Sequence, residues 1–231
     1  GSLNRIHGTQ FNDFLVARAP DETSDGSVLF GAGGNNTLLG NIGADVLVSG
    51  GGRDVLIGNA GADVFQIVAD TKSAETSVAD LENALDQLLG GGVALEQNTY
   101  TVQRYGSVSQ TTDQTDTLAE ALRGIHDELE IDSTKVDLRT VVTDFSRGFD
   151  SLNSDRVVFT GVQESSGLGK DISAHHLTWG ANDYIYVVAQ SMSESGNGNP
   201  NDAFVSALLI PEFSPVDVEL TDLESAGIYA V

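Results

Sequence analysis

Side chains with oxygen donors recur every nine residues near the start of the chain, as Asn36, Asp45, Asp54 and Asp63. A glycine stands two positions before each of them, and a leucine or phenylalanine stands two positions after. Ca²⁺ prefers roughly six to eight oxygen ligands, drawn from carboxylates, amide side chains and backbone carbonyls. The spacing therefore predicts calcium binding by a set of side-chain and turn-carbonyl ligands: Gly34, Asn36, Gly43, Asp45, Gly50, Gly52, Asp54, Gly61 and Asp63.

The elements that must position these ligands are the turns and strands of one nine-residue repeat. Four frames beginning at residues 31, 40, 49 and 58 read GAGGNNTLL, GNIGADVLV, SGGGRDVLI and GNAGADVFQ. The frame before them is degenerate, and the segment from Gly8 to Val16, GTQFNDFLV, fits the same pattern. Six residues form a tight turn, where glycine adopts conformations that other residues resist, and three form a short strand. Two frames then make one turn of a flattened coil, so Asp45 and Asp63 share one edge while Asn36 and Asp54 share the other.

This repeat resembles the nonapeptide G-G-x-G-x-D-x-U-x of the RTX (repeats-in-toxin) family, and the resemblance covers residues 8–70. It implies a parallel β-roll that holds Ca²⁺ between successive turns of one edge, through the sixth-position Asp side chains and turn carbonyls. Carried onto this chain, it implies one site between Asp45 and Asp63 and a second between Asn36 and Asp54. Asn36 and Ser27 stand where the family pattern has Asp.

A later segment, Thr143-Asp144-Phe145 through Gly148 and Asp150 to the apolar run Arg156–Phe159, is similar to one that follows the RTX repeats in serralysin-like proteases. In that family the segment helps to close the end of the roll. The resemblance implies that Asp144 and Asp150, together with Asp70, add calcium ligands. The alternative interpretation is a turn with two exposed carboxylates.

The rest of the chain predicts a mainly β fold: a parallel β-roll continued into a β-sandwich-like C-terminal part, with a small α-helical insertion. We expect a roll over residues 1–70, a helical insertion over 71–135 and a β-rich capping region over 136–231. Apolar residues at helical spacing predict helices at 77–89 and 117–129, with a strand at 100–108 and a polar loop between. Apolar runs predict strands at 184–189 and 204–210, separated by a hairpin loop. Outward-facing positions of the repeat strands are apolar, which predicts that the remainder packs over at least one face of the roll: Val46, Val48, Val55, Ile57 and Val64.

Composition excludes several classes of partner. The chain of 231 residues has a formal net charge of −23, so it repels nucleic acid phosphates and anionic membranes. It contains no Cys, which excludes disulfides and thiolate metal sites, and it has no apolar run of transmembrane length. We expect no nucleic acid partner, no membrane insertion and a monomeric state.

No catalytic motif is present. The sequence has no H-E-x-x-H, no G-x-S-x-G and no phosphate-binding loop. We expect His175 and His176 to be surface or strand-end residues, and Trp179, Tyr184 and Tyr186 to be core residues rather than a sugar-stacking platform. The sequence therefore predicts a chain that is not an enzyme.

The resemblance also implies a biological setting. RTX proteins commonly leave the cell through a type I secretion ABC transporter, guided by an uncleaved C-terminal signal, and residues 221–231 could belong to one. Gly1-Ser2 looks like a cloning remnant, so we expect a fragment. The favoured function is a module at the C-terminal end of a large surface adhesin of a Gram-negative bacterium, secreted and folded by extracellular Ca²⁺. The alternatives are the RTX module of a secreted protease, lipase or alginate epimerase, and a carbohydrate-binding module.

Overall fold

Seven short strands fill the repeat region. The computed structural model describes residues 4–18, 26–69, 81–89, 94–105, 107, 110–146, 154–162, 164–165, 169–170, 172–190, 204–212, 223–224 and 227–231. Within the first two of these ranges, each frame contributes one strand: β1 (Asn4–His7), β2 (Phe14–Val16), β3 (Ser27–Phe30), β4 (Thr37–Leu39), β5 (Val46–Val48), β6 (Asp54–Ile57) and β7 (Val64–Val68).

Alternate strands pair in parallel, which confirms the β-roll predicted from the repeat. One sheet runs β1-β3-β5-β7 and the other begins β2-β4-β6. From β3 to β7 the register joins residues eighteen apart, as in Leu47 with Phe65 and Leu38 with Leu56. The first pair of each sheet has a longer offset, as in Ile6 with Leu29 and Leu15 with Leu38. One residue of each strand from β3 to β7 faces the partner sheet, and these five side chains are fully buried: Leu29, Leu38, Leu47, Leu56 and Phe65.

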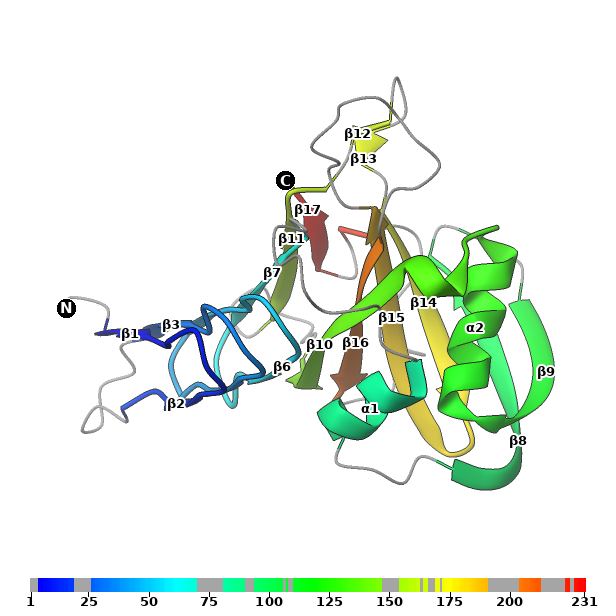
Figure 1. The fold of residues 1–231 in the computed structure, drawn as a ribbon, viewed down its shortest axis with the longest axis horizontal. Coiled ribbons are helices and arrows are strands. Elements are labelled where there is room, and N and C mark those ends of the chain that lie inside the picture. The colour runs from blue at the N-terminus through cyan, green and yellow to red at the C-terminus, as the bar shows by residue number, and fades with distance from the viewer. Residues whose placement is uncertain are drawn as a thin grey trace.

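Both sheets of the roll continue into the rest of the chain (Figure 1). β7 pairs with β11 (Arg156–Thr160), which pairs with β17 (Ile228–Ala230), all in parallel. β6 pairs in parallel with β10 (Val136–Phe145), and from there the sheet extends through strands that are mostly antiparallel. These are β16 (Phe204–Pro211), β15 (Asn182–Gln190), β14 (Ile172–Trp179), β8 (Ala94–Arg104) and β9 (Gln110–Thr117). A separate short pair consists of β12 (Glu164–Ser165) and β13 (Gly169–Lys170).

Two helices cover one face of the nine-stranded sheet. α1 (Leu81–Leu89) and α2 (Leu118–Glu128) bury their apolar stripes in a cluster that includes Trp179 and Tyr186. Thr117 caps α2 by accepting the Glu120 N–H at 3.2 Å, and a 3₁₀ turn (Ser133–Lys135) then leads into β10. The opposite face of the sheet packs into the same hydrophobic core as the roll. This single cluster of buried side chains includes Leu38 of the roll and Val187 of β15. We call the part of the chain outside the roll the cap.

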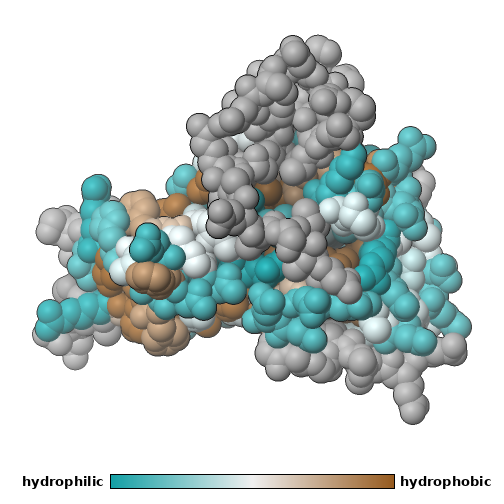
Figure 2. Space-filling view, viewed as in Figure 1, coloured by the Kyte–Doolittle hydropathy of each residue, from teal (hydrophilic) through white to brown (hydrophobic). Residues whose placement is uncertain are grey.

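Two expectations need correction. The polar segment expected as a loop is the edge strand β9, which pairs with β8 as a hairpin of the large sheet. The remainder of the chain was expected to pack over at least one outer face of the roll. Instead, the cap continues the two sheets at the end of the roll, where β10 pairs with β6 and β11 pairs with β7. Of the five outward-facing residues, Val55 packs against the cluster beneath the helices, whereas the other four are half-buried. Figure 2 shows hydrophobic residues, in brown, on the visible surface at the roll end of the molecule.

Candidate metal centre

Carboxylates stack along the edge of the roll that leads into β5 and β7. Oδ1 of Asp45 accepts the Ser27 N–H at 2.5 Å, and Oδ1 of Asp63 accepts the Asp45 N–H at 2.8 Å. Each side chain therefore bonds to the turn eighteen residues earlier. The structure brings the predicted pair Asp45 and Asp63 together on adjacent turns.

A third carboxylate, Asp155, continues this stack and was missed in the sequence. Its Oδ1 accepts the Asp63 N–H at 2.9 Å, although the two residues lie 92 positions apart. Its Oδ2 accepts the Ser146 N–H at 2.8 Å. The local signal was present, because Asp155-Arg156-Val157 repeats the pattern of Asp, any residue and an inward apolar residue.

The other edge differs in its chemistry. The Nδ2 amide of Asn36 donates to Oδ1 of Asp54 at 2.9 Å, and its backbone N–H donates to the same oxygen at 2.9 Å. In the next strand of this edge, Thr140 occupies the register position of Asp54. Oδ1 of Asn36 accepts the Asp13 N–H at 2.9 Å, so on this edge a neutral amide stands between two carboxylates, whereas Asp45, Asp63 and Asp155 are consecutive carboxylates.

The Oδ2 oxygen of Asp45 and of Asp54 accepts a backbone N–H from four residues earlier, and this bond is missing at Asp63. Oδ2 of Asp45 accepts the Asn41 N–H at 2.5 Å and Oδ2 of Asp54 accepts the Gly50 N–H at 2.8 Å, each four residues earlier. The equivalent donor for Asp63 is the Asn59 N–H, which instead bonds Oδ2 of Asp144 at 2.6 Å. As a result, Oδ2 of Asp63 is buried without a hydrogen-bond partner. Asp144 lies at this turn, and Asp70 and Asp150 lie outside the described residues.

Burial without counter-charge raises the pKa values of these carboxylates. Burial, followed by the like charges of Asp155, Asp45 and Asp144, raises the pKa of Asp63 to about 8. Burial also raises the pKa of Asp155 to about 7, and that of Asp54 to about 6. Among the described residues, no Lys or Arg forms an ion pair with Asp63 or Asp155. A bound cation would favour the ionised form of these groups and lower their pKa values.

Glycines in the turns let the backbones of neighbouring turns come close together on both edges of the roll. Gly34, Gly52 and Gly61 have φ values of +82°, +87° and +136°, a region that side chains disfavour. A Cβ on Gly61 would lie 2.5 Å from the carbonyl oxygen of Gly43, so two turns meet here backbone to backbone. In the described part of the chain, no group of three or more His, Cys, Asp or Glu side chains is placed to hold a metal by itself. A metal at this edge must therefore use carbonyls as well, and an all-oxygen set of carboxylates and carbonyls fits Ca²⁺.

The histidines and aromatic residues of the cap that could have a functional role are buried: His175, His176, Trp179, Tyr184 and Tyr186. His175 and His176 lie within β14 and are 1% and 9% exposed, so the surface placement expected for them is wrong. Burial lowers the pKa of His175 to about 4. The prediction that Trp179, Tyr184 and Tyr186 are core residues is confirmed.

Comparison with known proteins identifies the repeat. Residues 28–65 match the family model of the RTX calcium-binding nonapeptide repeat, in four copies. Residues 28–65 therefore carry RTX nonapeptide repeats, and repeats of this kind bind Ca²⁺. Neither the curated proteins nor the solved structures gave a match to this chain. No helix in the described ranges is long and apolar enough to span a membrane.

Proposed function

We propose that this module folds on extracellular Ca²⁺ after type I secretion and forms the C-terminal end of a large surface adhesin of a Gram-negative bacterium. The observation that carries the proposal is the stack of buried carboxylates Asp45, Asp63 and Asp155. Without a cation, these groups repel one another in a structure where burial already disfavours their charge.

Little else in the roll offsets this repulsion. Each nonapeptide buries one Leu or Phe, a gain of about 1.5–3 kcal/mol for each side chain. This gain offsets only part of the backbone entropy that is lost when a glycine-rich repeat is ordered. Binding of Ca²⁺ then becomes part of the folding free energy, as in other metal-coupled domains. A chain unfolded at low cytosolic calcium stays threadable for an ABC transporter and folds outside.

The setting in an adhesin is favoured over the alternatives on two grounds. A carbohydrate-binding module needs exposed aromatic faces, and the aromatic residues considered for that role, Trp179, Tyr184 and Tyr186, are buried. For catalysis, the sequence offers no recognisable nucleophile, base or metal–water motif, and we propose that the chain has no activity of its own. If the chain is a module of a secreted hydrolase, the parent gene should encode a protease, lipase or epimerase motif upstream. If it is part of an adhesin, the parent gene should encode no such motif.

Export in a Gram-negative host that carries a type I transporter tests the proposal. The intact chain should reach the medium, whereas a chain with residues 221–231 in scrambled order should stay inside. The exported chain should resist protease in millimolar Ca²⁺ and be degraded in EGTA. An Ile42→Ala variant, altered at an exposed side chain, is the control and should behave as the parent. Equal export of the intact and scrambled chains would contradict the secretion part of the proposal.

A further inference from the structure

The end of the roll that lies away from the cap has two strands without an outer neighbour (Figure 1). β1 is the outermost strand of one sheet and β2 is the outermost strand of the other. Among the described residues, β1 pairs only with β3, and β2 pairs only with β4. Open edges of this kind are templates for pairing with another chain.

β2 directs the backbone groups of two residues away from the roll. The Ala17 N–H donates to the Leu39 carbonyl at 2.7 Å. Alternate residues of a strand direct their N–H and C=O groups to the same side, so those of Phe14 and Val16 point outward. The side chains of these two residues are 67% and 46% exposed, whereas Leu15 between them packs against the roll core.

β1 has the same pattern on the other sheet. The Gly8 N–H donates to the Phe30 carbonyl at 2.7 Å, so the backbone groups of Arg5 and His7 point outward. Ile6 lies between them and packs against the roll core. Each open edge is therefore symmetric about one inward apolar residue, and such an edge is complementary to an antiparallel copy of itself.

We propose that two copies of the chain dimerise head to head through this end, with β1 and β2 each antiparallel to the same strand of the second copy. A two-fold axis beside Leu15 brings Phe14 opposite Val16 of the second copy, and the two residues exchange both backbone hydrogen bonds. Their exposed side chains then form a cross-strand pair of an aromatic and a β-branched residue, twice in the dimer. The Leu15 side chains meet at the axis, as do those of Ile6, which extends the core from one roll into the next.

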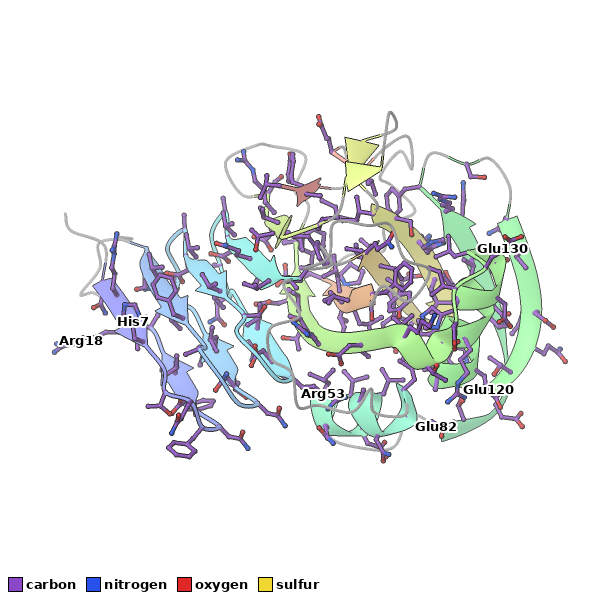
Figure 3. All side chains as sticks on the ribbon, turned by 45° about the horizontal axis from the view of Figure 1, so that its top comes forward. His7, Arg18, Arg53, Glu82, Glu120 and Glu130 are labelled. Carbon is purple, nitrogen blue, oxygen red and sulfur yellow. The ribbon has the colours of Figure 1, made fainter. Side chains whose placement is uncertain are left out.

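Charge favours a second copy as the occupant of this end. The described residues 4–18 contain two Arg and one Asp and no Lys or Glu, a charge of +1 in a chain of −23. Two copies therefore meet here without the repulsion between their acidic surfaces. Figure 3 shows Arg18 at this end, and pairing about Leu15 sets it beside Asp13 of the second copy. In the described part of the chain, Asp13 accepts both of its side-chain bonds, from Thr9, through Oδ2, so Oδ1 is placed for this ion pair.

The dimer differs from the monomeric state expected from the sequence. It goes beyond the proposed function, since it requires only that the roll is folded.

Sedimentation velocity of the whole chain in millimolar Ca²⁺, over a range of protein concentrations, tests the proposal. The parent chain should dimerise. Phe14→Lys should raise the dimer dissociation constant by about tenfold or more, because the two-fold axis makes each copy lose the pair with Val16. The control is Ile42→Lys, which makes the same change at a side chain that is 63% exposed and lies outside β1 and β2. It should leave the constant unchanged. Circular dichroism checks that each variant is folded, and Val16→Lys replaces Phe14→Lys if the latter does not fold.

Disulfide formation tests the register, because the chain has no Cys of its own. Leu15→Cys should join two copies rapidly under mild oxidation, since residues facing each other in a non-hydrogen-bonded pair have Cα atoms about 4.5 Å apart. Ile42→Cys is the matched control and should react much more slowly. A folded parent chain that stays monomeric at every concentration would overturn the proposal and leave these edges to a different partner. Equal effects of Phe14→Lys and Ile42→Lys, or equal rates for the two Cys variants, would also overturn it, because the copies would then meet through another surface.

Discussion

Raising the pH from about 6.5 to about 8 in the absence of calcium should destabilise the folded chain. Asp63 and Asp155 have folded pKa values of about 8 and about 7, well above the ordinary aspartate value of 3.8. Across this window the folded state binds more protons than the unfolded state, so stability falls as pH rises. The buried His126 and His175 act in the opposite direction, because their pKa values are lowered to about 4 in the folded chain and only the unfolded chain binds their protons near pH 6.5. Their contribution is smaller than that of the two aspartates, because they lose few protons above this pH.

The magnitude follows from the same pKa values. One pH unit costs about 1.4 kcal/mol for a group that is protonated only in the folded state. Asp63 stays largely protonated up to about pH 8 and Asp155 up to about pH 7, so the two together lose on the order of 2 kcal/mol. Thermal unfolding followed by circular dichroism in EDTA measures this loss. Asp63→Asn cannot ionise and should show a much smaller pH dependence.

Saturating Ca²⁺ should reverse the trend, because the ion stabilises the ionised carboxylates and competes with protons. Stability in EDTA that is constant or rises with pH across this window would refute the reasoning. An equal loss in Asp63→Asn would show that other groups cause the pH dependence.

Two further predictions concern the packing of the roll. Gly50→Ala should destabilise the roll by about 1–3 kcal/mol or more in urea titrations, because its Cβ would overlap with the Ala32 carbonyl oxygen of the neighbouring turn. Gly33→Ala is the control and should be tolerated better, since its Cβ would come no closer than 3.3 Å to Gln10. Leu56→Ala should cost about 2–5 kcal/mol from a fully buried position, while Ile42→Ala, 63% exposed, should change stability by less than about 0.5 kcal/mol.

The roll could be predicted from the sequence because its pattern is local. Each frame carries its own glycine, its ligand and its inward residue, so the register of Asp45 with Asp63 follows from the period alone. The same locality explains why Asp155 was missed. Its frame has lost the turn glycine, and a long insertion separates it from the repeat, so only pairing in three dimensions shows its position.

The cap was less predictable because tertiary contacts override local pattern there. β9 consists of Gln, Thr and Asp residues without apolar alternation, and it is held as a strand by pairing with β8. His126 is polar yet fully buried, where it contacts the Tyr186 hydroxyl at 2.8 Å and the Ser133 hydroxyl at 3.0 Å. Arg53 is similarly buried between the roll and the cap, 3.8 Å from Asp137 (Figure 3). In each case the partner lies far away in the sequence or is an ordinary polar residue, so neither residue identifies the other from the sequence.

Hydrogen exchange of the roll amides, measured in EDTA and again in millimolar Ca²⁺, tests the central claim most directly. The backbone bonds that join β5 to β7, such as that from the Val64 N–H to the Asp45 carbonyl, report on the roll itself. Our account predicts that at neutral pH these amides exchange much faster in EDTA than in calcium, and that exchange in EDTA becomes faster still as the pH rises toward 8. They should become protected when Ca²⁺ is added, and Mg²⁺ at the same concentration should protect them far less. Full protection in EDTA, unchanged by calcium, would contradict the coupling of folding to calcium.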